Sequence, residues 1–586
     1  MLDRTAFLGV AHSVTGRRWV GASVETERLG LAIAQTADLP EIVGRVLATR
    51  GVLPEEADAY LAPTLRDLMP DPSTLPDMDA AAERLAKAVM RRERVALFGD
   101  YDVDGAASVA LLCDWLAAFG ITATVHIPDR IEEGYGPNRP AMARLGAAHD
   151  LVICLDCGST SPDPVAAAVE GGAEVLIVDH HLAEGPVPSA MATVNPNRSD
   201  CDSDQGALCA AGVAFLLLVA TNRHLRLQGA FTARPEPKLL DVLDLVALAT
   251  IADVAPLTGL NRAFVRQGLT VLARRGRPGL AALSDVAGLS APPTARDLGF
   301  ALGPRINAGG RIGEAGLGLR LLCAPDAATA EALAGRLDAL NRERREIEAA
   351  VLAAAEAQIE GRDKPGALVW AAGAGWHPGV VGIVASRLKE RHNRPAIVIG
   401  LDGEEGKGSG RSVPGVDLGT SVAALAAEGL LLRGGGHAMA AGLSVASENV
   451  EPAMAALERL LARQGAGAAG PRDLAIDGLL TPEAASRSLI ETLEQAGPFG
   501  QASPAPRFAF ASVRVKGMRR VGQGHLAFRV GTLEAIAFRA EETGLASVLS
   551  AAGETGSALH LAGRLEIDDW GGRRRVKLRL EDAAQP

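Results

Sequence analysis

The sequence is poor in aromatic residues and cysteine and has no long apolar run. Phe, Trp and Tyr make up 3% of its 586 residues, so a long platform for stacking nucleic-acid bases is not expected. Six cysteines are too sparse for a disulfide framework, which favours a reducing, cytoplasmic location. The longest uncharged apolar stretch, Cys209 to Thr221, is shorter than the ~20 residues of a membrane-spanning helix. Residues 1–20 lack the apolar core of a secretory signal.

An excess of basic charge is also absent, since the formal net charge is −11. A protein that coats duplex DNA with its whole surface is expected to be basic, so that mode of binding is disfavoured, whereas a local basic groove is not. The acidic balance also suits a carboxylate-rich site for divalent cations. The 48% of apolar residues is typical of globular proteins, and the length corresponds to three or four domains of roughly 100–200 residues.

The first half of the chain alternates between buried strands and helices. Predicted strands cover residues 95–98, 122–127, 151–155 and 175–178, and predicted helices cover 106–119, 164–170 and 239–252. This alternation predicts βαβ units and a parallel sheet, with ligands at the carboxyl ends of the strands.

Residues 327–359 form a long helical pattern rich in Ala, Glu and Arg that could bridge two lobes. A second α/β segment follows, with strands at 367–370 and 396–399, and residues 466–471 read as a linker. Short alternating runs at 508–515, 526–530 and 559–567 predict a small β-barrel of OB-like type. The predicted fold is therefore α/β, with two parallel-sheet domains joined by a long helix and followed by a barrel. The predicted boundaries are 1–45 for an N-terminal extension, 46–325, 326–362 for the connecting helix, 363–468 and 469–586.

Acidic residues and histidines gather at the ends of four of these buried segments. They are Asp100, Asp102 and Asp104 after the first strand, Asp156 after the third, Asp179, His180 and His181 after the fourth, and Asp253 after the helix at 239–252. Any single Asp could be a helix N-cap or a turn residue, but the joint occurrence points to one site. Carboxylates brought together repel one another, and a cation resolves the conflict. Oxygen ligands with one imidazole suit Mn²⁺ or Mg²⁺, and two such ions can drive phosphoester hydrolysis.

In order, these four motifs resemble those of the DHH phosphoesterase superfamily and, more narrowly, the RecJ family of single-strand-specific exonucleases. The resemblance implies that the domain at 46–325 is a DHH domain and that the domain at 363–468 is a DHHA1 domain. It implies two metal ions held by Asp102, Asp104, Asp156, His180 and Asp253, with Asp156 bridging them. It also implies that His181 lies beside the leaving group and that Asp100 and Asp179 support the ligands. Phe98 stands where the pyrophosphatase branch has a ligating His, which argues against that branch.

Five loops carry candidate residues for binding a nucleic-acid strand. They are Arg130, Tyr135 and Asn138; Arg305, Asn307 and Arg311; His377; Ser409 and Arg411; and Gly436 and His437, in a Gly-Gly-His triplet typical of DHHA1 domains. Arg130 could clamp a phosphate and Tyr135 could stack on a base, although a solvated Arg and a packed Tyr are the ordinary alternative. The resemblance implies that Arg130, Ser409 and Arg411 grip the 5′ phosphate, which gives a 5′→3′ polarity.

The implied protein is a monomeric exonuclease that acts in recombinational repair and mismatch excision, with single-strand-binding protein and a RecQ-type helicase as partners. One alternative is a phosphodiesterase for short oligoribonucleotides or cyclic dinucleotides, although such DHH enzymes usually lack the barrel. Another is a catalytically dead clamp on single strands, which need not retain its acidic motifs. The barrel itself could bind a strand through residues such as Arg514, Arg519 and Phe528, or could be an ordinary barrel with solvated Arg.

Overall fold

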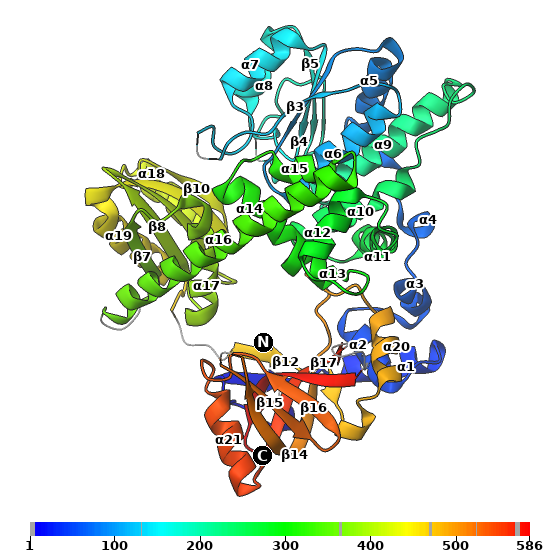
Figure 1. Ribbon diagram of the computed structural model, residues 1–586. Coiled ribbons are helices and arrows are strands. Elements are labelled where there is room, and N and C mark those ends of the chain that lie inside the picture. Colours follow the sequence, from blue (N-terminus) through cyan, green and yellow to red (C-terminus); the bar gives the residue numbers. More distant parts are fainter. Residues whose placement is uncertain are drawn as a thin grey trace. The chain divides into compact units, whose positions relative to one another are not determined.

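A computed structural model describes residues 6–130, 132–183, 185–362, 366–467, 472–522, 524–568 and 575–586. The chain divides into two compact units. The central unit comprises Pro70–Ala255 and Gln267–Ala469, and the terminal unit comprises Met1–Met69, Pro256–Arg266 and Gly470–Pro586. Each unit is built around its own sheets (Figure 1). The predicted linker at 466–471 lies partly outside the described residues.

The first sheet of the central unit has five parallel strands in the order β3-β2-β4-β5-β6. Their bounds are β2 Val95–Gly99, β3 Thr124–His126, β4 Leu151–Leu155, β5 Glu174–Val178 and β6 Ala192–Val194. Every residue of β2 and β4 is buried, as expected for a parallel sheet covered on both faces. The predicted parallel sheet is confirmed, and β6 is a strand that the sequence analysis did not predict.

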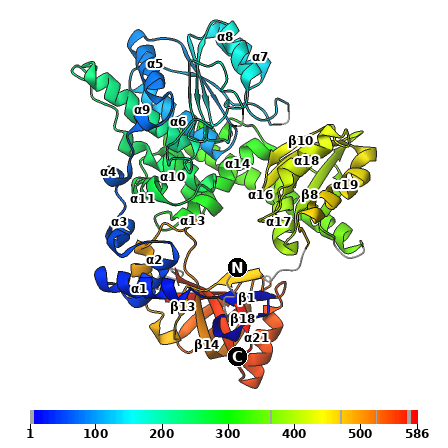
Figure 2. The same cartoon turned by 180° about the vertical axis from the view of Figure 1, so that it is seen from behind.

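Helices cover both faces of this sheet. One face carries α7 (Arg139–Ala148) and α8 (Pro162–Glu170), whose apolar side chains share a core with Phe98 and Cys154. The other side carries α5 (Met78–Arg91), α6 (Val103–Ala117) and α9 (Ala210–Leu227), as Figure 2 shows from behind. The apolar stretch from Cys209 is thus the first part of a helix that packs in the core. No helix of the described residues has the length and apolarity needed to cross a bilayer.

A group of helices follows this sheet in the chain. It contains α10 (Leu243–Ala252), α11 (Gly259–Ala273), α12 (Pro278–Val286), α14 (Gly303–Ile312), α15 (Leu317–Leu322) and α16 (Ala327–Glu360). The 34-residue α16 begins at Asp326, whose carboxylate caps it by accepting from the Thr329 amide at 2.8 Å. Helix α16 contacts α12 and α14 at one part and β7 and α17 at another, so the predicted long helix connects this helical group to the second sheet (Figure 1).

The second sheet of the central unit has the order β10-β11-β9-β8-β7 and is mixed. Its strands are β7 Val369–Ala374, β8 Ala396–Asp402, β9 Glu405–Arg411, β10 Arg433–His437 and β11 Ala440–Ala446, with helices α17 Pro378–His392, α18 Leu418–Ala427 and α19 Val450–Arg463. Only the β7–β8 pair is parallel. The prediction of a parallel sheet here was wrong, because β8 and β9 are joined by a tight turn at Gly403 that reverses the chain.

The terminal unit is built around a five-stranded barrel. Strands β14 Phe508–Val521, β15 His525–Val530, β16 Leu533–Ala537, β18 Arg575–Ala584 and β17 Ala558–Asp568 follow one another in space, and β14 pairs with β17 to close the barrel. Helix α21 (Leu545–Thr555) lies between β16 and β17 in the chain. The predicted OB-like barrel is confirmed. Phe528 is buried in the barrel core, so it offers no ring to a strand at the surface.

The beginning of the chain belongs to this same terminal unit. Strand β1 (Arg17–Val20) pairs in parallel with β12 (Arg472–Ala475), and Val43 and Val46 of helix α2 (Glu41–Thr49) pack in the barrel core. Helix α1 (Val24–Thr36) was not predicted. The structure therefore differs from the predicted separate extension and from the boundary at residue 46, because the partners of these residues lie more than 400 positions away in the chain.

Candidate metal centre

The four acidic motifs meet at the carboxyl edge of the first sheet. Asp100 follows β2, Asp156 follows β4 and Asp179 follows β5, while Asp253 is the C-cap of α10. Asp102 is the N-cap of α6 and accepts from the amides of Asp104 at 2.9 Å and Gly105 at 3.1 Å. Asp102 is therefore a helix N-cap, the ordinary role that a single Asp could have. The same capping geometry holds its carboxylate at the site.

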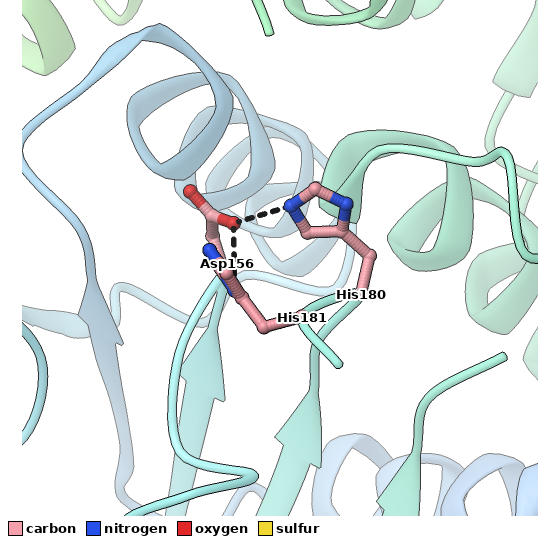
Figure 3. Close-up of side chains that lie close together, drawn as sticks. All are labelled: Asp156, His180 and His181. Carbon is pink, nitrogen blue, oxygen red and sulfur yellow. Dashed lines mark ion pairs between the residues drawn. The ribbon is translucent and has the colours of Figure 1, made fainter. Parts of the chain in front are cut away.

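Three groups of side chains have ligand atoms that all lie within 4.8 Å of one another. They are Asp156 with His180 and His181, Asp104 with His180 and Asp253, and Asp100 with Asp102 and Asp156. Figure 3 shows the first group, in which both imidazoles face the Asp156 carboxylate. Because Asp156 and His180 each belong to two groups, the three groups adjoin one another and share ligands. All five predicted ligands are brought together, and Asp100, predicted as a supporting residue, also lies within ligand distance.

Asp156 is held in an unusual environment. Its backbone has φ +62°, a left-handed conformation that is uncommon for a residue with a side chain. Oδ1 of Asp156 and Oδ1 of Asp100 are both buried, and neither has a hydrogen-bond partner among the described residues. Buried carboxylate oxygens without a donor fit a site that binds cations.

Repulsion among the carboxylates has clear electrostatic consequences. Burial, together with the neighbouring Asp102, raises the pKa of Asp100 to about 8. Burial and the charge of Asp104 raise the pKa of Asp253 to about 8 and that of Asp156 well above its usual range. A divalent cation would remove this penalty, because it compensates the negative charges that burial and proximity make costly.

Asp104 faces His180 and also accepts hydrogen bonds from the start of helix α9. Its two oxygens accept from the amides at the start of α9, from Ala210 at 2.7 Å and from Ala211 at 2.9 Å. A carboxylate at a helix N-terminus is favoured by the unpaired amides and the helix dipole. The bonds fix the direction of the carboxylate, so that Oδ2 lies 3.8 Å from Nε2 of His180.

Asp179 orients His181. One of its oxygens accepts from the amides of His180 and His181 and lies 2.8 Å from Nδ1 of His181, and the other accepts from the Ser159 amide at 3.0 Å. Burial opposes the ionised form, but these bonds and the charge of His181 lower the pKa of Asp179 to about 2. Burial likewise lowers the pKa of His181, but the bond to Asp179 outweighs it and raises that pKa to about 9. These contacts hold the His181 ring; the supporting role of Asp179 stays a prediction.

Two asparagines that the sequence analysis missed fix the backbone of the histidine pair. Asn195, directly after β6, donates to the carbonyl of His181 at 2.8 Å, and Asn197 donates to the carbonyl of His180 at 2.6 Å. The signal that could have revealed them is a polar residue at the end of a short buried strand, which required predicting β6. Phe98 is buried among apolar side chains on the face below α7 and offers no ligand.

Four of the predicted strand-binding residues form a basic cluster next to the acidic site: Arg130, Arg311, His377 and Arg411. Arg130 lies 5.1 Å from the ring centroid of Tyr101, close enough to lower the pKa of Asp100. Burial and the charges of Arg130 and Arg344 lower the pKa of Arg311 to about 10, and burial with Arg130 also lowers that of Arg411.

The second sheet contributes to the basic cluster through close packing. Arg311 donates to the carbonyl of Gly379 at 3.1 Å near the start of α17, where His377 is the N-cap. Ser409 accepts from Arg411 at 3.0 Å. A Cβ on Gly382 would lie 3.0 Å from Oγ of Ser409, so the glycine lets α17 approach β9. Guanidinium groups gathered in this way suit an anion with several oxygens, such as a phosphate.

Three of the remaining predicted strand-binding residues, Asn138, Arg305 and Asn307, make structural contacts. Asn138 caps α7 and donates to Glu133 at 2.8 Å, and Arg305 pairs with Asp338 at 2.9 Å. Asn307 accepts from the Val103 amide at 3.1 Å and so steadies the loop that carries Asp102. Gly436 has φ +146° and lies in close contact with β11, while His437 is exposed at the end of β10. These contacts explain the positions of the Asn138 and Arg305 side chains without any contact to a nucleic-acid strand.

Comparison with known families and proteins agrees with this geometry. Residues 94–250 match the DHH family, N-terminal domain; residues 364–463 match the DHHA1 domain; and residues 476–582 match the RecJ OB domain. The fold and the site thus define a DHH protein with an attached DHHA1 domain.

More narrowly, the chain is 37% identical to the single-stranded-DNA-specific exonuclease RecJ of Dickeya dadantii over 562 residues, which cover 93% of this chain and 96% of the relative. It is 35% identical to RecJ of Escherichia coli, with the same coverage of both chains. The crystal structure of RecJ from Thermus thermophilus in complex with Mn²⁺ superposes with a TM-score of 0.80 at 31% identity, covering 97% of this chain and 79% of that one. The chain belongs to the RecJ family.

Proposed function

We propose that this protein is a metal-dependent exonuclease that degrades single-stranded DNA from the 5′ end and releases 5′-mononucleotides. One observation carries the proposal: three ligand groups, connected to one another through Asp156 and His180, lie beside the basic cluster. A strand whose 5′ phosphate binds Arg130, Ser409 and Arg411 would place a phosphodiester near the carboxylates. The Mn²⁺ and Mg²⁺ complexes of the Thermus thermophilus relative support divalent cations as cofactors here.

Two divalent cations bound by these groups would supply activation of water and neutralisation of charge on the phosphodiester. The protein's own part is to hold Asp102, Asp104, Asp156, His180 and Asp253 within ligand distance before the ions arrive. His181, which Asp179 orients, would stabilise or protonate the leaving 3′ oxygen. The basic cluster fixes the strand end, so that hydrolysis repeats from that end.

The cellular setting is a further part of this proposal. We place the protein in the cytoplasm as a monomer, in recombinational repair and mismatch excision, with single-strand-binding protein and a RecQ-type helicase as partners. The names of its relatives support single-stranded DNA as the substrate. A phosphodiesterase for short oligoribonucleotides or cyclic dinucleotides is disfavoured, because the chain retains a complete barrel in addition to the two α/β sheets.

Digestion of end-labelled single strands tests the proposal. The same DNA sequence should be offered with and without a 5′ phosphate, in Mn²⁺ and in EDTA, with a blunt duplex and an RNA of the same sequence as controls. We expect mononucleotides from the 5′ end of the DNA strand in Mn²⁺, faster with the phosphate, and no product in EDTA. Cleavage from the 3′ end, or preferential cleavage of a di- or trinucleotide RNA, would contradict it.

A further inference from the structure

Tyr135 lies against the candidate acid–base residue rather than standing free. Its hydroxyl oxygen is 3.0 Å from Nε2 of His181 and 3.5 Å from the carbonyl oxygen of Asp156. The two rings meet edge to face, with centroids 5.8 Å apart and an interplanar angle of 73°. The sequence suggested only that this tyrosine stacks on a base, a role that would use the ring and leave the hydroxyl without a task.

The loop around Tyr135 is built to hold this position. Gly134 and Gly136 flank the tyrosine with φ +88° and φ +73°, left-handed conformations that suit glycine and turn the side chain toward β4 and β5. The Glu133 carboxylate accepts from Asn138 at 2.8 Å and from the Asp129 amide at 3.1 Å. The loop is therefore anchored on both sides of the tyrosine.

The opposite edge of the imidazole is held by Asp179. The Asp179 carboxylate is an acceptor only, since three backbone amides already donate to it, so Nδ1 of His181 carries the proton of the 2.8 Å bond. Nε2 is then the atom that faces Tyr135. A phenolic hydroxyl can donate to a bare Nε2 or accept from a protonated one, so the bond persists in either state of the ring.

We propose that Tyr135 is a positioning residue for hydrolysis: its hydroxyl, together with Asp179, fixes the imidazole of His181 in the orientation that hydrolysis requires. The inference rests on the proposed function and adds a residue to it. The hydrogen bond to His181 needs only the hydroxyl of Tyr135. A phenylalanine at this position therefore keeps the ring and any stacking but loses the hydrogen bond. That difference separates the two roles of Tyr135.

The test is steady-state digestion of a 5′-phosphorylated single strand in Mn²⁺ by wild type, Tyr135→Phe, Tyr135→Ala and Tyr60→Phe. Tyr60 lies in the terminal unit, so its variant controls for loss of a phenol elsewhere. We expect Tyr135→Phe to lower kcat about 10-fold with KM changed less than about two-fold, as losses of orienting hydrogen bonds do. Thermal melts of all four proteins establish that each is folded.

The outcomes are distinct. If Tyr135→Phe matches the wild type and only Tyr135→Ala is impaired, Tyr135 acts through its ring and the proposal is overturned. If Tyr135→Phe raises KM and leaves kcat unchanged, the hydroxyl binds the strand and the proposal is again overturned. Failure of the wild type itself to release mononucleotides would instead refute the proposed function, since that reference reaction does not depend on the tyrosine's role.

Discussion

Nε2 of His180 lies 3.3 Å from Oδ1 of Asp156, while Nδ1 of the same ring lies 3.9 Å from Oδ2 of Asp253. One imidazole thus faces carboxylates from two different elements, the end of strand β4 and the end of helix α10. Asp156 in turn lies within ligand distance of Asp100 and Asp102. The two residues therefore connect the adjoining ligand groups, and their loss should affect both.

Replacing Asp156 by Asn should abolish hydrolysis but stabilise the metal-free fold. Activity is expected to fall on the order of 10³-fold, the upper range for loss of one charge-stabilising group. Burial and neighbouring carboxylates disfavour the Asp156 charge, so removing that charge relieves repulsion. Thermal melts in EDTA should show an equal or higher Tm than the wild type. A variant that keeps its activity in a Mn²⁺ titration would remove Asp156 from the site.

The stability of the metal-free protein should decrease with rising pH. Asp100 has a pKa of about 8 in the folded protein, against about 3.9 in an unfolded chain. The unfolded chain releases this proton first, so the free energy of unfolding in EDTA should fall as the pH rises from about 4 to about 8. Excess Mn²⁺ should remove most of that loss, because the ions bind the ionised carboxylates.

Denaturation curves across this pH range would measure the effect, with Asp100→Asn as the matched control. The variant lacks one of the titrating groups, so its stability should depend less on pH in EDTA. If the wild type became more stable between pH 5 and pH 8 in EDTA, the carboxylates would not be held in the repulsive arrangement of the structure.

Arg411 should determine the preference for a 5′-phosphorylated end. A charge-assisted bond contributes about 1.5–3 kcal/mol, so Arg411→Gln should raise KM for the phosphorylated strand about 10-fold or more. The strand with a 5′ hydroxyl should be affected little. Kinetics on both strands measure the ratio, with Arg433→Gln, an exposed arginine of β10, as the control. An equal loss on both strands would assign Arg411 to general strand binding.

The convergence of the acidic motifs could be predicted from the sequence because strand ends in a parallel sheet share one edge. Strand β4 occupies the predicted residues 151–155, and Asp156 follows it directly. The contacts of Asn138 and Tyr135 could not be predicted, because they depend on how a loop folds back onto Glu133 and His181. The sequence of a loop indicates where the chain turns, but it does not indicate which distant side chains the loop will contact.

Strand β9 shows a different limit. Its sequence, Glu405–Arg411, alternates glycine with polar residues and has no pattern of buried side chains. Cβ atoms on Gly406 and Gly408 would collide with Ile399 and Leu443. Glycine at these positions therefore leaves room for the neighbouring apolar side chains. The information that makes this segment a strand therefore lies in its partners, and β-propensity could not reveal it.

The N-terminal strand should stabilise the terminal unit through one buried pair. Nε1 of Trp19 donates to Oδ2 of Asp582 at 2.9 Å, and both side chains are fully buried. Trp19→Phe removes the donor and leaves a carboxylate oxygen short of a partner, so the free energy of unfolding should fall by about 2 kcal/mol. Urea denaturation followed by circular dichroism measures the loss. Because the two groups are coupled, Trp19→Phe combined with Asp582→Asn should cost less than the sum of the single changes. Additive losses would mean that the two residues act independently.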